Sequence, residues 1–81
     1  MYYCYILYSK KLDTYYIGST SNIEDRLKRH NSGRSKYTKP GIPWTLVYCK
    51  QYTSKAAAYQ AELYIKSQKS RKHIEELLKN L

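Results

Sequence analysis

The N-terminal stretch YYCYILY, residues 2–8, does the most to limit the folds open to this chain. Apolar or aromatic side chains stand at both its odd and its even positions. Because successive side chains of a β-strand point to opposite faces, such a strand has two apolar faces to bury. We therefore expect it in the interior of a sheet, covered from both sides, and not at an exposed edge.

The next segments predict a hairpin and a helix. KKLDT, residues 10–14, is a polar connector, and YYIGS, residues 15–19, predicts a second strand that pairs with the first. A capping box formed by Ser21 and Glu24 predicts the start of a helix, because each side chain can bond the backbone N–H of the other. Gly33 stands where this helix is expected to end.

The second half of the chain predicts one strand and two helices. A basic Pro–Gly loop, RSKYTKPGIP, precedes the strand WTLVYCKQY, residues 44–52. Thr53 or Ser54 can cap a helix over 55–68, and Ser70 can cap another. That last helix presents an apolar face made of Ile74, Leu77, Leu78 and Leu81. The order β-β-α-β-α-α predicts an α+β fold: a small three-stranded sheet, antiparallel or mixed, flanked by about three helices in one domain, 1–81.

The charge of the chain points to a polyanionic partner. Lys and Arg number 15 against 6 Asp and Glu, which leaves a net charge of +9 on 81 residues. Such an excess favours nucleic acid or an acidic membrane surface. Tyr occurs 11 times and Phe is absent, which favours a sheet with wet edges or a site that uses phenols.

The sequence contains no targeting signal that we can identify. It has no run of about 18 apolar residues, and its N-terminus lacks the features of a signal peptide. We expect a cytoplasmic protein without a membrane partner. Cys4 and Cys49 are expected to be reduced core thiols, and a disulfide between them stays open as the alternative.

Glu62 is out of place in the helix expected over 55–68. At about 100° per residue, apolar side chains leave this helix almost no polar side. These apolar residues are Ala58, Tyr59, Ala61, Leu63 and Ile65. A carboxylate among them is costly unless it has a partner. An ion pair with Lys66, four residues on, is one explanation, and a metal ligand or catalytic carboxylate in a cleft is the other.

Arg26 and His30 lie on the same side of the expected first helix, beside its apolar stripe. Arg26 can extend harmlessly to solvent, or it can aim a planar guanidinium into a cleft and bind phosphate. His30 can simply be a histidine that the C-terminal end of the helix favours. Tyr5 and Tyr16 lie on strands, where most tyrosines serve packing. Gly18 either ends its strand or lets a backbone or ligand come close.

Basic residues are spread over several of the expected elements, and two aromatic residues stand near the basic Pro–Gly loop. A run of charge usually marks a solvated face, but this set also suits a surface that tracks phosphates, with stacking positions at Tyr37 and Trp44. The candidate nucleic-acid contacts are Arg34, Lys36, Tyr37, Lys39 and Lys66.

Several of these features, in their order along the chain, resemble the GIY-YIG nuclease family. Tyr3 and Cys4 replace the Gly and Ile of the first motif, but its tyrosine remains as Tyr5. KYT and WTLVY resemble the small single-domain bacterial members, and the likeness covers about residues 2–75. The motifs that carry it are YCY at 3–5, YIG at 16–18, RLKRHNSG at 26–33 and Glu62 in AELYIK.

The resemblance implies metal-dependent hydrolysis of DNA phosphodiesters, in a process such as repair or recombination, with RNA as an open alternative. Glu62 would hold a single Mg²⁺ or Mn²⁺, since one carboxylate with waters and phosphate can suffice. Arg26 would neutralise the phosphoryl transition state. Tyr16 or Tyr5 would take the proton of the attacking water, with His30 as a relay that favours the phenolate.

One departure from the family leaves other functions open. Some members carry a lysine after the YIG glycine, where this chain has Ser19. His30 could substitute for it, or activity could be weak. A nucleic-acid-binding module with little or no activity is therefore the alternative, and a basic protein–protein adaptor on the same fold is a third interpretation.

Overall fold

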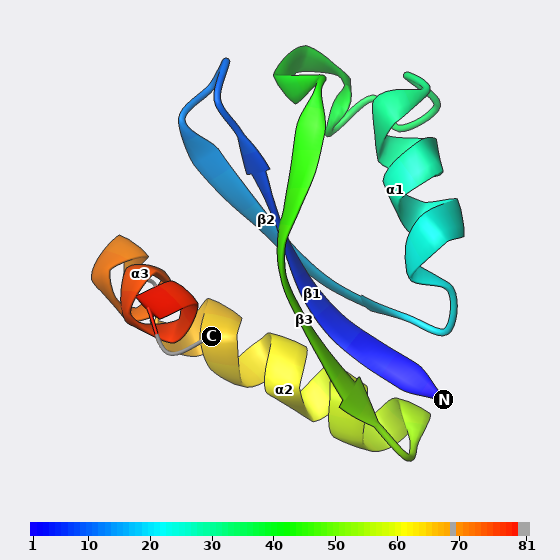
Figure 1. The fold of residues 1–81 in the computed structure, drawn as a ribbon, viewed down its shortest axis with the longest axis vertical. Helices are drawn as coiled ribbons and strands as arrows, with labels where there is room; N and C mark the ends of the chain where they lie inside the picture. Colours follow the sequence, from blue (N-terminus) through cyan, green and yellow to red (C-terminus); the bar gives the residue numbers. More distant parts are fainter. Residues whose placement is uncertain (69, 80–81) are drawn as a thin grey trace.

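The computed structural model describes residues 1–68 and 70–79, which form an antiparallel three-stranded sheet with helices on both faces (Figure 1). The strands lie in the order β2-β1-β3, so the first strand is interior, as its sequence predicts. The element order β-β-α-β-α-α is confirmed, and the sheet is antiparallel rather than mixed. The elements are β1 (Tyr2–Ser9), β2 (Thr14–Thr20), α1 (Ile23–Asn31), a 3₁₀ helix (Lys39–Gly41), β3 (Trp44–Tyr52), α2 (Lys55–Gln68) and α3 (Arg71–Lys79).

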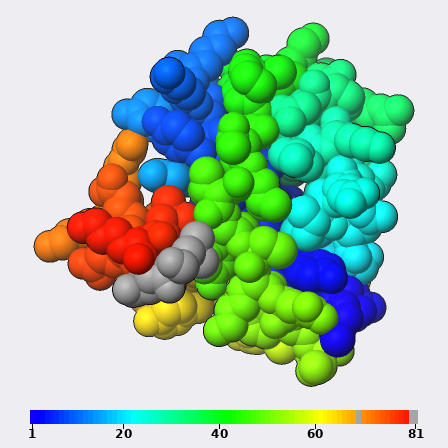
Figure 2. Space-filling model, viewed as in Figure 1, coloured from blue at the N-terminus to red at the C-terminus, as the bar shows by residue number. Residues whose placement is uncertain are grey.

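Strand β1 separates two apolar layers. Its side chains alternate, with Tyr5 and Leu7 on one face and Cys4 and Ile6 on the other, and all four are buried. Figure 1 shows α1 on one side of the sheet and α2 with α3 on the other. We call the face with Tyr5 the α1 face and the face with Cys4 the α2 face. In the same view, Figure 2 shows β3 between α1 and α3 on the surface.

A β-bulge in β3 changes which side chains reach each face. Ile6 of β1 pairs with Tyr48, but Leu7 pairs with Leu46, so Val47 is an extra residue. Val47 and Tyr48 both pack on the α2 face, whereas Leu46 packs on the α1 face. A period of two does not predict this shift.

Trp44 joins β3 to the end of α1. Its backbone N–H donates to Asn31 Oδ1 at 2.6 Å, and its carbonyl accepts from Asn31 Nδ2 at 3.0 Å. The indole Nε1 donates to the carbonyl of Thr38 at 2.7 Å, and the residue is 5% exposed. The expectation that Trp44 offers a stacking surface is therefore wrong, because its ring belongs to the core.

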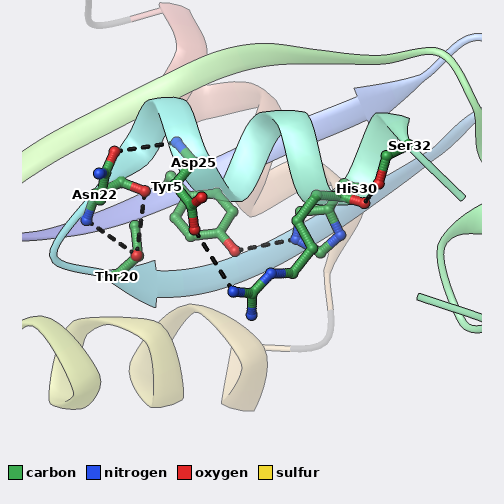
Figure 3. A network of polar contacts seen from close by, with 7 residues as sticks. Tyr5, Thr20, Asn22, Asp25, His30 and Ser32 are labelled. Atoms are coloured by element: carbon green, nitrogen blue, oxygen red, sulfur yellow. Dashed lines mark hydrogen bonds and ion pairs between the residues drawn. The ribbon is translucent and has the colours of Figure 1, made fainter. Parts of the chain in front are cut away.

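Helix α1 begins with a different cap from the one that the sequence predicts. The side chain of Asn22 accepts from the N–H of Asp25 at 3.0 Å (Figure 3). Ser21 and Glu24 form no capping box. Thr20 Oγ1 accepts from the N–H of Asn22 at 3.1 Å, which holds Asn22 in the extended conformation of a cap. The prediction of the cap was wrong by one residue because Thr20 orders the chain before the helix.

The other helix boundaries agree with the sequence. Gly33 follows α1 with a φ of +80°, a left-handed conformation that favours glycine. Ser54 Oγ accepts from the N–H of Ala57 at 3.1 Å at the start of α2. Ser70 Oγ accepts from the N–H of His73 at 3.3 Å at the start of α3.

Some expectations about burial need correction. Tyr59 and Leu63 of α2 are 50% and 39% exposed, so this helix has a solvent side. Cys49 is exposed while Cys4 is buried, and both are free thiols. The expected apolar face of α3 packs inward through Ile74, and Leu81 lies outside the described residues. In the ranges 1–68 and 70–79, the helices are too short or too polar to cross a membrane.

Gly18 allows the ring of Tyr5 to extend across strand β2. The two residues are partners in the β1–β2 register, and Tyr5 is 2% exposed. A Cβ at position 18 would lie 2.5 Å from Tyr5 Oη and 2.7 Å from its Cζ. Since such distances are sterically forbidden, only glycine lets the hydroxyl of an interior-strand tyrosine reach over this edge strand.

His30 forms a buried polar link between α1, β1 and the loop before β3. Figure 3 shows its contact with Tyr5 of β1. Its Nε2 lies 3.3 Å from Tyr5 Oη and its Nδ1 lies 3.0 Å from Thr38 Oγ1. Burial lowers the pKa of His30, and the charges of Arg26 and Arg29 lower it further. The ring is therefore neutral at neutral pH.

We expect Gly18→Ala to lower the free energy of unfolding by about 1–3 kcal/mol, since a methyl group forced into a filled space displaces its neighbours. The three atoms nearest to this methyl group all belong to the hydroxyl end of the Tyr5 side chain. In a Tyr5→Leu background, which lacks those atoms, the same change should cost under about 0.5 kcal/mol. Urea denaturation of the four proteins measures both values, and an equal cost in the two backgrounds would contradict the contact.

We expect His30 to make stability depend on pH. Above the ordinary His pKa of 6.5, the ring is neutral in the folded and the unfolded chain, and its contribution to stability is complete. As the pH falls below 6.5, the unfolded chain binds a proton first, so the free energy of unfolding decreases until the folded-state pKa is passed. Urea denaturation between about pH 7.5 and about pH 5 should show the difference between wild type and His30→Gln shrinking toward low pH. A constant difference would refute this assignment.

Candidate functional site

The predicted site residues form two groups on opposite faces of the edge strand β2. The tyrosine–histidine cluster lies on the α1 face and consists of Tyr5, Tyr16, Arg26 and His30. Glu62 of α2 lies on the α2 face and contacts β2 through Ser19. The structure therefore brings four of the predicted catalytic residues together directly and places the fifth on the far side of one strand.

Local strand geometry assembles the tyrosine–histidine cluster. Tyr16 and Gly18 are two residues apart and share the α1 face, whereas Tyr15 packs on the α2 face, as the strand period predicts. The ring centroids of Tyr16 and His30 are 4.6 Å apart, and those of Tyr5 and Tyr16 are 6.4 Å apart. Both phenols thus lie beside one neutral imidazole.

The surroundings of Tyr5 raise its pKa above that of an ordinary phenol. Burial raises the pKa of Tyr5 to about 12, the neighbouring Tyr16 adds to the rise, and Arg26 opposes it. Tyr5 therefore keeps its proton at neutral pH and can donate it to Nε2 of the neutral His30 ring. In this arrangement Nδ1 of His30 carries a proton and donates to Thr38.

Both carboxylate oxygens of Glu62 have partners. Oε1 accepts from Ser19 Oγ at 2.8 Å, and Oε2 accepts from Lys66 Nζ at 2.5 Å. The Glu62 side chain is 11% exposed, while that of Lys66 is 48% exposed. The hydrogen bond to Glu62 raises the pKa of Lys66, so its ammonium stays charged. The ion pair that the four-residue spacing suggests is present.

Two hollows lie along β2, and each is lined by residues from both faces of the sheet. The larger, of about 660 Å³, has Tyr16 of the α1 face and Lys66 in its wall. The smaller, of about 270 Å³, is lined by Arg26 of α1 together with Ser19 and Ala58. Groups from both faces of the sheet therefore reach the same open edge, although β2 separates Tyr5 from Glu62.

The donor set fits a hard divalent cation bound through one carboxylate. Glu62 and the hydroxyl of Ser19 offer oxygen atoms, which Mg²⁺ and Mn²⁺ prefer. Among residues 1–68 and 70–79, no three His, Cys, Asp or Glu side chains gather to hold a metal ion. An ion here would complete its shell with water and phosphate oxygens, as Mg²⁺ commonly does.

The candidate nucleic-acid contacts fall into two places. Arg34, Lys36 and Lys39 are exposed on the segment between α1 and β3, and Tyr37 there is 82% exposed. The ring centroid of Tyr37 lies 6.2 Å from that of Tyr16, so this segment borders the larger hollow. Lys66 lies instead on α2, bound to Glu62. Contact of these five residues with nucleic acid stays a prediction.

Sequence reasoning missed two residues that position the site. Ser19 stood out only as a departure from a lysine, but its place one residue after Gly18 turns its side chain toward α2. Thr38 is 1% exposed and contacts His30. The only sequence feature that drew attention to Thr38 was its place in the KYT segment, which resembles the small bacterial family members.

The comparisons with known proteins agree with this arrangement. The family model of the GIY-YIG catalytic domain matches residues 1–75. A UPF0213 protein of Bacillus cereus is 40% identical over 77 residues, which cover 94% of this chain and 79% of that protein. A UPF0213 protein of Staphylococcus haemolyticus is 40% identical over 79 residues, covering 93% of this chain and 95% of its own length.

A solved structure shows a similar fold. The solution NMR structure of a UPF0213 protein from Bacillus halodurans matches this one with a TM-score of 0.62 at 36% sequence identity. The match covers 98% of this chain and 84% of that one. Both groups of site residues lie within the span of the family match. The chain therefore belongs to the GIY-YIG family.

Proposed function

We propose that this protein is an endonuclease that hydrolyses DNA phosphodiesters with a single Mg²⁺ or Mn²⁺ at Glu62. The observation that carries the proposal is the open edge of β2, where Tyr16 and Arg26 arrive from one face of the sheet and Glu62 from the other. Membership of a nuclease family supports the reaction class. Acid–base, phosphate-binding and carboxylate groups are thus available along one edge.

Tyr16 is the better candidate for the base that takes the proton of the attacking water. Tyr5 is buried, has a pKa of about 12 and can donate to His30, so its role is to position its neighbours. Tyr16 lines the larger hollow, and its ring lies beside that of His30 at a tilt of 57°.

Arg26 is proposed to bind the phosphoryl group. It lines the smaller hollow beside Ser19, and its guanidinium lies close enough to Tyr5 to influence that phenol. A planar guanidinium pairs well with phosphate oxygens and stabilises the charge that develops on them. A divalent ion held by Glu62 would add stabilisation of the leaving oxygen.

The net charge of +9 and the exposed basic segment between α1 and β3 support DNA as the partner, with RNA as a second substrate to test. Arg34, Lys36 and Lys39 are proposed to contact phosphates, and Tyr37 to stack on a base beside Tyr16. A role in repair or recombination would use an enzyme of this kind.

Cleavage assays on end-labelled duplex, single-stranded, flap and branched DNA test the proposal. Wild type should cut at least one substrate with Mg²⁺ or Mn²⁺, and Glu62→Gln should remove metal-dependent cleavage. Arg26→Ala should reduce the rate by about 100-fold or more, because one charged partner of the transition state is lost.

Arg29→Ala is the matched control, since Arg29 lies on the same helix and pairs with Asp25 at 3.5 Å on the surface. It should change the rate by only a few fold. An equal loss of cleavage rate in Arg26→Ala and Arg29→Ala would mean that Arg26 acts only through its general positive charge. Salt-sensitive DNA binding without any cleavage would favour the binding module, for which Ser19 at the lysine position is the supporting observation.

A further inference from the structure

We propose that Lys66 occupies the place of the divalent cation on Glu62, so that metal binding must displace its ammonium from Oε2. This inference rests on the proposed function, because it takes Glu62 as the metal ligand. It makes Lys66 a positioning residue that sets the metal affinity of the site, in addition to any contact with nucleic acid.

The two oxygens of Glu62 are held unequally. Oε1 is bound to Ser19, a short side chain on strand β2, at 2.8 Å. Oε2 is bound at 2.5 Å to the end of a long side chain that is 48% exposed, whereas Glu62 itself is 11% exposed. Ser19 therefore orients the carboxylate from the protein side, and Lys66 covers it from the solvent side.

The carboxylate of Glu62 needs a cation beside it, but its ion pair with Lys66 is weak. A largely buried carboxylate is costly without a compensating charge, and the ammonium supplies one when no metal is bound. The Lys66 side chain is 48% exposed, so solvent screens its ammonium and the flexible stem loses freedom when it binds, which weakens this bond. A divalent ion offers twice the charge to the same oxygen.

The structure also offers a place for the displaced ammonium. Lys66 and Tyr16 line the same hollow of about 660 Å³ at the edge of β2. The flexible stem of lysine lets its ammonium turn from Glu62 into this space. There it would lie beside the proposed base.

Binding of Mn²⁺ to the full chain, without nucleic acid and at neutral pH, tests this proposal. Free Mn²⁺ is measured by electron paramagnetic resonance for wild type, Lys66→Met and Lys66→Gln, with circular dichroism to verify folding. Removing the competing charge should lower the Kd about tenfold in both variants. Lys10→Met is the matched control: it removes the same charge from the turn between β1 and β2, at the end of the hairpin away from Ser19, and should leave the Kd within about twofold.

A Kd in Lys66→Met and Lys66→Gln equal to or higher than that of wild type would overturn the proposal. The double variant Glu62→Gln/Lys66→Met must lose the gained affinity, and tight binding in it would overturn the proposal as well. Absence of Mn²⁺ binding in every protein would overturn the proposal too, and metal-dependent cleavage by the same wild-type protein would then show that the proposed function still stands. Unchanged affinity beside metal-dependent cleavage would reject the role of Lys66 alone.

Discussion

The burial of β1 on both faces is the constraint on which the rest of the structure depends. Because Tyr5 and Cys4 point to opposite layers and both need cover, α1 must pack on one side and α2 on the other. The candidate site residues of this chain come from those two layers. They can approach each other only where the sheet ends, and the edge strand β2 is that place.

Gly18 and Ser19 bring candidate site residues from both faces to this edge. Gly18 has no side chain, so the hydroxyl of Tyr5 can extend over the strand on one face. Ser19, the next residue, faces the other way and fixes one oxygen of Glu62. Two adjacent small residues thus serve opposite faces of the same strand.

Regular patterns in the sequence predicted most of the fold. The two-sided apolar strand, the alternation of Tyr15 and Tyr16 and the four-residue spacing of Glu62 and Lys66 all follow from fixed periods of strand or helix, and all are observed. The family resemblance added the residues of the site, whose order along the chain no periodicity explains.

What the sequence did not predict depends on single contacts that break those periods. The cap at Asn22 follows from a hydrogen bond to Thr20, and the burial of Trp44 follows from its bonds to Asn31 and Thr38. The bulge at Val47 inserts one residue into an otherwise regular strand. Such contacts join residues that have no regular spacing, so they become visible only in three dimensions.

The division of the site between two layers has a consequence for its behaviour during local opening. The tyrosine–histidine cluster needs only β1, β2, α1 and the loop that carries Thr38, whereas the carboxylate arrives with α2. Elements of one domain can detach from the sheet separately, each with its own opening free energy. An excursion that frees α2 would remove Glu62 and leave the phenols and imidazole assembled, so hydrogen exchange in α2 would report how often the two groups are separated.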